Sequence, residues 1–253
     1  MYFIDTHAHL FLEEFDTDRK DVIERSIHQG IKKMILPNVD YKTLNPMLDT
    51  VDINQDVLFP AIGVHPCSIK EGYKEELKLI KEELNKRKYK AIGEIGLDLY
   101  WDKTFYTQQI EALEEQINWA SELNLPVILH CRETLDQTIK LVQKYKNLKG
   151  VFHAFTGNEN QAKQIVDMGF YIGIGGVVTF KNSGLDKVAP SIPLQNIVLE
   201  TDSPYLTPTP LRGKRNEPIY VKLVAEKLAT LHNVHIEEVT TITSKNAEKL
   251  FNI

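Results

Sequence analysis

The sequence is poor in cysteine and has no long apolar segment. Its 253 residues include only two cysteines, Cys67 and Cys131, which are too few and too far apart for a disulfide framework. No apolar run approaches the length that crosses a bilayer, and no basic and apolar leader precedes the first predicted strand. We therefore expect a cytoplasmic protein that does not enter a membrane.

Excess positive charge, linkers and phosphate-binding loops are also missing. The net charge of −5 argues against a protein that holds nucleic acid by bulk positive potential, although bound cations would reverse the sign locally. No linker, charge block or short repeat marks a domain boundary. Gly173-Ile174-Gly175-Gly176 has neither the spacing of a dinucleotide loop nor the Gly-Lys-Ser/Thr of a P-loop. These absences favour one domain over residues 1–253.

The chain instead alternates short apolar runs with helical patterns. The apolar runs predict eight strands, at residues 3–5, 33–36, 58–63, 91–93, 127–129, 150–152, 171–174 and 197–199. Apolar residues spaced by three and four predict helices at 18–29, 75–88, 108–123, 135–145, 161–168, 218–231 and 244–251. Pro46 and Pro190 weaken the helical pattern after the second and seventh strands. Eight such units in this length are typical of an α/β fold, the (β/α)8 or TIM barrel, as a single domain.

Two histidines, one residue apart, come directly after the first predicted strand. In an extended chain the side chains at i and i+2 point the same way, so His7 and His9 can bind one ion. Such a pair also arises by chance, and a lone histidine is often a packing residue. The metal interpretation therefore depends on the residues at the ends of the other strands.

Ionisable side chains also follow the later strands. His65 follows the third, Glu94 the fourth, His130 the fifth, His153 the sixth and Asp202 the eighth. The carboxyl ends of all strands of a parallel barrel open on one face, where active sites of this fold lie. Helix capping explains one such carboxylate but not the whole set at one register. The sequence therefore predicts a metal site.

Six predicted ligands are more than one tetrahedral ion needs. We expect two divalent ions, Mg, Mn or Zn, that share Glu94 as a bridge. The first ion would bind His7, His9, Glu94 and Asp202, and the second Glu94, His130 and His153. Paired ions stabilise the attacking and leaving oxygens of a hydrolytic displacement. Glu94 and Asp202 are the predicted catalytic residues, with Asp202 also the general base that accepts a proton from water.

Seven short motifs span nearly the whole chain: Asp5-Thr6-His7-Ala8-His9, Gly63-Val64-His65-Pro66, Gly93-Glu94-Ile95-Gly96-Leu97-Asp98, His130-Cys131-Arg132, His153-Ala154-Phe155-Thr156-Gly157, Glu200-Thr201-Asp202-Ser203-Pro204-Tyr205 and Arg212-Gly213-Lys214-Arg215-Asn216-Glu217-Pro218. Together they resemble the TatD family of metal-dependent deoxyribonucleases, a branch of the amidohydrolase-like barrels. The resemblance implies the same six ligands and a magnesium-dependent 3' to 5' exonuclease that prefers single-stranded DNA. Imidazole-rich ligand sets favour softer ions than magnesium, so the metal stays open.

The bridging position separates this chain from many related barrels. Those barrels bridge their ions with a carboxylated lysine on the fourth strand, whereas this chain has Glu94 there. The difference disfavours amidases and phosphotriesterase-like enzymes.

Several residues near the predicted mouth suggest substrate contacts. Arg132 lies two residues after His130 and would face the same way, towards a phosphate oxygen. Its alternative role is an ion pair with Glu133 or Glu200. His65 is also expected to contact the substrate.

Two loops interleave basic and aromatic residues. Tyr100, Trp101 and Lys103 follow the fourth strand, and Arg212, Lys214 and Arg215 follow the eighth. Single-stranded nucleic acid is bound by rings that stack on bases and cations that contact the backbone. Of these residues, Arg212 is a predicted substrate contact. In the alternative interpretation, the aromatic rings cover the core, and Arg212 only holds its own loop in place.

The sequence thus predicts a metal-dependent phosphodiester hydrolase with single-stranded DNA as its substrate. An alternative is an ester or amide hydrolase on the same barrel, such as an aminoacyl-tRNA deacylase, because fold and metals do not fix the substrate. A non-catalytic metal-binding protein is a second alternative, against which the predicted base Asp202 argues. The sequence is compatible with a monomer and does not determine the oligomeric state.

Overall fold

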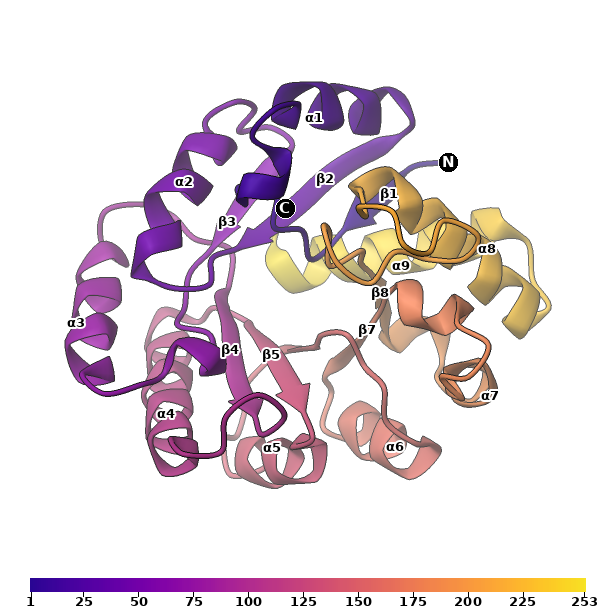
Figure 1. Cartoon of the computed structure of the whole chain (residues 1–253). Coiled ribbons are helices and arrows are strands. Elements are labelled where there is room, and N and C mark those ends of the chain that lie inside the picture. The colour runs from indigo at the N-terminus through magenta and orange to yellow at the C-terminus, as the bar shows by residue number, and fades with distance from the viewer.

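The computed structural model describes residues 1–253, in which helices surround eight parallel strands (Figure 1). The strands are β1 (Phe3–Asp5), β2 (Ile31–Pro37), β3 (Leu58–Ala61), β4 (Ile92–Asp98), β5 (Val127–Arg132), β6 (Gly150–Phe152), β7 (Tyr171–Ile174) and β8 (Ile197–Leu199). They pair in chain order from β1 to β3 and from β4 to β8. The predicted (β/α)8 barrel is confirmed.

Further hydrogen bonds close the ring of strands. Between β3 and β4, the Ile62 amide donates to the Ala91 carbonyl over 3.1 Å. Just after the ends of β1 and β8, the segments that follow the two strands are also joined: the Asp202 amide donates to the His7 carbonyl over 2.8 Å. The buried Asp5 carboxylate accepts from the Thr201 amide over 2.9 Å and from the Thr201 hydroxyl. The ends of β1 and β8 are therefore held side by side.

A helix follows each strand, and two follow the last one. They are α1 (Arg19–His28), α2 (Tyr41–Val51), α3 (Tyr73–Glu83), α4 (Tyr106–Leu123), α5 (Leu135–Val142), α6 (Glu159–Asp167), α7 (Leu185–Val188), α8 (Val221–His232) and α9 (Ile236–Phe251). Short 3-10 turns are η1 (Glu13–Phe15), η2 (Pro66–Ser68), η3 (Gly176–Thr179), η4 (Ala189–Ser191), η5 (Leu194–Asn196) and η6 (Pro218–Tyr220). None of the helices combines the length and the apolar character that a bilayer crossing requires.

Prolines interrupt the helical pattern of two connections. The helix α2 nevertheless runs through Pro46 and begins with a capping box, in which the Asp40 side chain accepts from the Thr43 amide over 2.8 Å. This cap stabilises the first turn of α2, which precedes the proline. After β7 the chain forms only short helical pieces around Pro190, as the interrupted pattern predicts.

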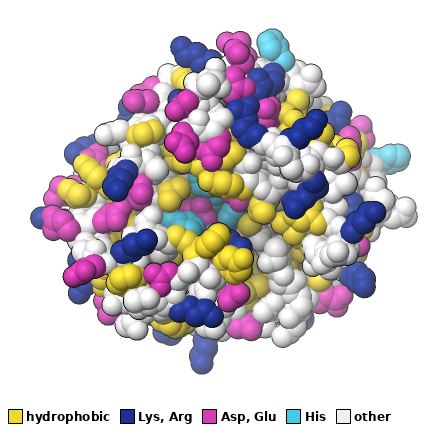
Figure 2. Space-filling model, in the orientation of Figure 1, with side chains coloured by type: hydrophobic (Ala, Val, Ile, Leu, Met, Phe, Trp, Pro, Cys, Tyr) yellow, Lys and Arg dark blue, Asp and Glu magenta, His cyan; other side chains and the backbone are white.

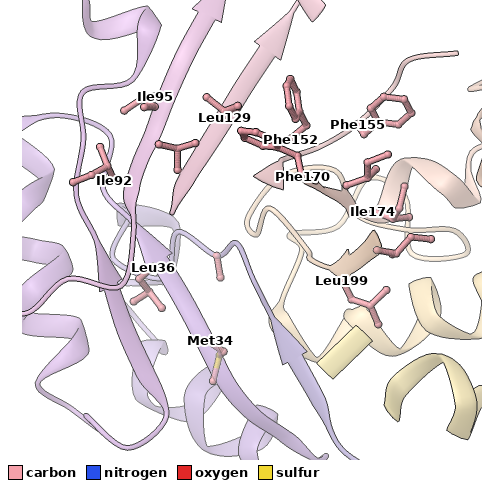
Figure 3. Packing of buried hydrophobic residues seen from close by; sticks show 14 of the residues in the cluster. Met34, Leu36, Ile92, Ile95, Leu129, Phe152, Phe155, Phe170, Ile174 and Leu199 are labelled. Atoms are coloured by element: carbon pink, nitrogen blue, oxygen red, sulfur yellow. The ribbon is translucent and has the colours of Figure 1, made fainter. Parts of the chain in front are cut away.

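Alternation along the strands builds two hydrophobic clusters. Residues that face the helices form a large cluster that includes Met34, Leu36, Leu129 and Phe152 (Figure 3). Their neighbours form a second cluster inside the barrel: Ile4, Ile35, Ala61, Ala91, Ile128, Val151 and Val198. Ala247, Leu250 and Phe251 of α9 join this inner cluster. The C-terminal helix thus covers the amino ends of the strands and leaves the carboxyl ends open.

The fourth strand is longer than the sequence pattern indicates. The apolar run ends at Gly93, but β4 continues to Asp98, so Glu94 lies within the strand and does not follow it. Gly96 permits this continuation because its φ is 151° and a Cβ there would collide with the backbone of His130. The same correction applies to His130, which lies within β5.

Candidate metal centre and substrate cavity

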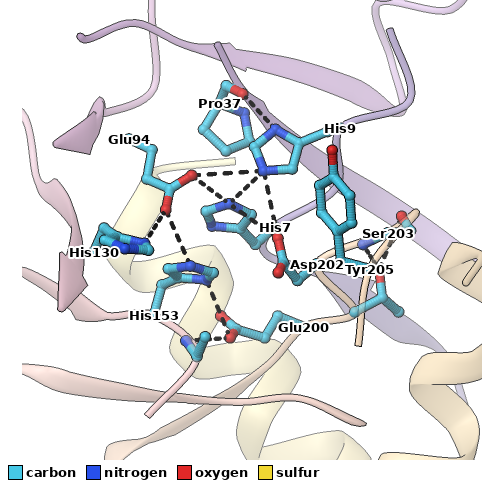
Figure 4. A network of polar contacts seen from close by, with 12 residues as sticks. His7, His9, Pro37, Glu94, His130, His153, Glu200, Asp202, Ser203 and Tyr205 are labelled. Carbon is cyan, nitrogen blue, oxygen red and sulfur yellow. Dashed lines mark hydrogen bonds and ion pairs between the residues drawn. The ribbon is translucent and has the colours of Figure 1, made fainter. Parts of the chain in front are cut away.

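Five histidines and two carboxylates converge at the open end of the barrel. They are His7, His9, His65, Glu94, His130, His153 and Asp202. Figure 4 shows His7, His9, His130 and His153 around Glu94 and Asp202. Figure 2 shows histidine and acidic side chains at the bottom of a central hollow on this face. The six predicted metal ligands therefore lie in one cluster, together with His65.

The Glu94 carboxylate lies between two groups of histidine rings. Its Oε2 lies 3.1 Å from His7 Nε2 and 3.5 Å from His9 Nε2. Its Oε1 faces three other rings: His130 Nδ1 at 2.9 Å, His153 Nε2 at 3.1 Å and His65 Nε2 at 3.5 Å. This carboxylate is placed as a ligand that bridges two ions would be.

Asp202 lies on the His7 and His9 side of the cluster. Its Oδ1 is 3.4 Å from His9 Nε2 and 3.8 Å from His7 Nε2. The residue has a φ of 58°, a left-handed conformation that aspartate adopts more readily than most residues. Its side chain is 15% exposed, whereas that of Glu94 is 4% exposed. Asp202 can therefore contact both the cluster and a water molecule in the cavity above it.

Two further carboxylates support the histidines and were not predicted. Asp98 Oδ2 lies 3.0 Å from His130 Nε2, and Glu200 Oε1 lies 3.3 Å from His153 Nδ1. A signal for Asp98 was present, because residues four apart on a strand share a face and Asp98 follows Glu94 by four. Such carboxylates fix the orientation of metal-binding imidazoles.

Electrostatics keep the central carboxylates ionised. Burial acts to raise the pKa of Glu94, but the surrounding histidine charges, that of His153 first, hold it well below its usual value. For Asp202, burial is outweighed by the hydrogen bond with His9 and by nearby histidine charges, so its pKa is also lowered. Burial lowers the pKa of His7, which favours the neutral imidazole that binds metal.

The donor set fits divalent cations. Every ion pair that Glu94, Asp98, Glu200 and Asp202 form is with a histidine, and none is with lysine or arginine. Four buried or half-buried carboxylates require compensating positive charge. Three groups of residues each have ligand atoms within 4.8 Å of one another: His7, His9 and Glu94; His65, Glu94 and His130; and His7, His153 and Glu200. The cluster is therefore compatible with a divalent metal site, and it includes His65, which the sequence assigned to substrate.

A cavity of about 770 Å³ lies over the cluster, and Arg132 is part of its wall. The Arg132 guanidinium lies over the Tyr100 ring, 3.7 Å from its centroid. The alternative ion pairs of Arg132 do not form, because Glu133 pairs with Lys103 and Glu200 with His153. Its N–H groups are thus not engaged by a carboxylate.

The two arginines of the loop after β8 are engaged outside the cavity, although Tyr205 and Leu206 of the same loop line it. The Arg212 guanidinium lies 3.8 Å from the centroid of Phe180, and Arg215 pairs with Asp18 at 2.7 Å and with Glu217 at 3.1 Å. Neither arginine lines the cavity. These contacts agree with the alternative interpretation, in which the arginines hold their own loop in place. Substrate binding by Arg212 stays a prediction.

Comparison with known proteins identifies relatives over the full length. The family model described as TatD related DNase matches residues 4–252. The chain is 40% identical over 252 residues to the uncharacterized metal-dependent hydrolase YabD of Bacillus subtilis (strain 168), with 98% of each covered. It is 30% identical over 257 residues to the 3'-5' ssDNA/RNA exonuclease TatD of Pantoea ananatis (strain LMG 20103), covering 98% of this chain and 99% of that one. The crystal structure of YjjV, a TatD homolog from Escherichia coli K12, matches with a TM-score of 0.93 at 31% identity, covering 99% of this chain and 98% of that one.

Proposed function

Because the chain belongs to the TatD related DNase family and is a metal-dependent hydrolase, we propose that it removes nucleotides from the 3' end of single-stranded DNA. The named exonuclease among its relatives supports this substrate class. The observation that carries the proposal is the Glu94 carboxylate, with one oxygen towards His7 and the other towards His130, at the floor of the cavity. A bridged pair of cations suits the in-line displacement at a phosphodiester.

The six predicted ligands would hold two divalent ions. The first would be bound by His7, His9, Glu94 and Asp202, and the second by Glu94, His130 and His153, with His65 beside this second group. When bound, the ions supply Lewis-acid chemistry that polarises the phosphoryl group and stabilises charge on the attacking and leaving oxygens. The chain itself supplies the position of the substrate and the transfer of the proton.

Asp202 is the proposed general base. It is ionised and partly exposed, so it can accept a proton as the oxygen of water attacks phosphorus and the bond from phosphorus to the 3' oxygen of the preceding nucleotide breaks. Arg132 would donate hydrogen bonds to a phosphate oxygen, since its guanidinium is held by Tyr100 and not by a carboxylate. Both residues line the cavity over the cluster.

Digestion of a 5'-labelled single-stranded oligonucleotide tests the proposal. Metal-stripped protein is restored separately with Mg, Mn and Zn, beside Asp202→Asn and Glu94→Gln. We expect a ladder that shortens from the 3' end, requires metal, and slows by about 100- to 10,000-fold in Asp202→Asn, the usual contribution of a general base. Asp21→Asn, which alters an exposed aspartate on α1 that forms no ion pair, is the matched control.

An intact oligonucleotide with every metal, in protein that still binds ions, would contradict DNA as the substrate. Esters and aminoacyl-tRNA would then be tested on the same site. Digestion that persists in Asp202→Asn at the wild-type rate would remove Asp202 from the proposed mechanism but leave the substrate in place.

A further inference from the structure

The loop after β4 exposes two large aromatic rings beside the cavity. Trp101 is 70% exposed and Tyr100 is 50% exposed, whereas Trp119, the other tryptophan, is 1% exposed. The two rings of the loop meet edge to face with centroids 5.0 Å apart. They therefore do not cover the core, and their exposure has a cost in apolar surface left in water.

The backbone of this loop is connected to the cluster of histidines and carboxylates through Asp98. Asp98 Oδ1 accepts from the Tyr100 amide over 2.8 Å and from the Trp101 amide over 3.2 Å. The other oxygen of the same carboxylate, Oδ2, lies 3.0 Å from His130 Nε2. Gln109 of α4 holds the Asp98 backbone through both the oxygen and the nitrogen of its side-chain amide, at 2.9 and 3.1 Å. One buried side chain thus sets the position of Trp101 relative to His130.

The indole of Trp101 has open space next to it. Trp101 lines the cavity over the cluster and also an adjoining cavity of about 540 Å³, whose walls include Pro66, Ile69 and Phe105. Both volumes lie in the range of small-ligand sites. Hydrophobic side chains surround the central hollow in Figure 2, and Tyr205, 50% exposed, lines the same cavity.

A cation lies next to the rings. The Arg132 guanidinium, stacked on Tyr100, is 5.3 Å from the centroid of the Trp101 ring. Proteins bind single strands with exposed rings that stack on bases and with cations, not already paired with a carboxylate, that contact the backbone phosphates. Here both lie on the wall of the cavity that contains Asp202.

We propose that Trp101 is the platform of a nucleobase-binding site, on which one unpaired base of the substrate strand stacks while Arg132 contacts a neighbouring phosphate. This inference rests on the proposed nuclease function and specifies its substrate as a strand whose terminal bases are free. A base within a duplex is stacked and paired, so its face is not available to the indole without unpairing.

Kinetics on two oligonucleotides test the site. The strands are identical except that the three residues at the 3' end of one carry no bases. Trp101→Ala is expected to lower kcat/KM by about 5- to 150-fold on the normal strand, the usual effect of removing one stacking ring, and by less than about twofold on the abasic strand. Trp101→Phe retains a ring and is expected to restore most of the loss. Tyr41→Ala removes an exposed ring that does not line the cavity and serves as the control.

Tryptophan fluorescence gives a readout that does not depend on cleavage. In the Asp202→Asn protein loaded with metal, the normal strand is expected to quench the emission of exposed Trp101, and the abasic strand is expected not to. Adding Trp101→Phe removes the quench, because the remaining Trp119 is buried.

The outcomes separate this inference from the proposed function. Equal losses on both strands in Trp101→Ala would overturn the nucleobase site, because the ring would then act only by supporting the loop. An unchanged rate on the normal strand would overturn it while the nuclease proposal stands. If wild-type protein cleaves neither strand with any metal, the proposed function fails and this inference fails with it.

Discussion

At the scale of single residues, Glu200 shows how a buried carboxylate orients a histidine of the cluster. It is 1% exposed, accepts a hydrogen bond from the Ala154 amide and lies 3.3 Å from His153 Nδ1. The space for it depends on Gly173, because a Cβ at that position would collide with the Glu200 carboxylate. His153 can therefore point its Nε2 towards Glu94, 3.1 Å away.

Replacing Glu200 by glutamine is expected to weaken metal binding without unfolding the protein. The amide keeps the shape but loses the charge that favours the Nδ1–H form of His153. Partners of this kind are worth about 10- to 100-fold in metal affinity. Titration of metal-stripped protein with Zn, with circular dichroism to monitor the fold, measures the change. Glu159→Gln, at an exposed position of α6, is the control, and equal Zn affinity in both variants would contradict the role of Glu200.

The predicted ligands and the supporting carboxylates differ in what the sequence reveals. His7, His130 and Asp202 could be assigned to one site because each lies at or near a strand end, and topology brings strand ends together. The partner of Glu200 could not be assigned. The sequence suggested Arg132 as the partner of Glu200, but in the structure Glu200 pairs with His153. Which of the two residues Glu200 contacts depends on side-chain directions, which sequence spacing does not encode.

At the scale of elements, β4 contains the central carboxylate and depends on a glycine. Gly96 has a φ of 151° and lies against the backbone of His130 in β5. The sequence pattern predicts an end to this strand at Gly93, since the apolar run stops there and glycine is a weak strand former. Gly96 is required because its backbone approaches that of His130 closely. This requirement can be recognised only once the position of β5 is known.

Gly96→Ala is expected to lower the free energy of unfolding by more than about 3 kcal/mol, because it combines a forbidden φ with a collision against backbone. Gly184→Ala is the matched control, since it also has a positive φ, of 72°, but nothing within 4 Å of the added Cβ. That variant should lose about 1–2 kcal/mol. Urea denaturation compares the two, and equal losses would show that the β4–β5 contact yields to the new methyl group.

At the scale of the whole molecule, the barrel could be predicted and its exact closure could not. Eight alternating units in the chain specify the architecture, because parallel strands need crossover helices. The contacts that join β1 to β8, such as Asp5 with Thr201, involve residues 196 positions apart, and no local pattern reports them. The length of α9, which begins at Ile236 and not at 244, was also missed.

Bound ions are expected to stabilise the whole barrel. Ligands that bind the folded state alone raise its stability, by about 2.7 kcal/mol at a free concentration of 100 times Kd. For a chain of this size that corresponds to a rise in Tm of about 5–10 °C. Thermal denaturation of metal-stripped protein with and without added Zn or Mn measures it. The Glu94→Gln variant should show a smaller rise in Tm. A wild-type Tm that does not change when metal is added would contradict a metal site that has both Glu94 and Asp202 as ligands.

The contact between Asp5 and Thr201 also sets an order of events in time. Ribosomes add about 5–20 residues per second, so roughly 10–40 s separate the synthesis of these two partners. During that interval His7 and His9 have emerged while Asp202 has not been made. The nascent chain therefore cannot assemble the complete cluster, and the proposed ion site that includes Asp202 can form only after translation has passed β8.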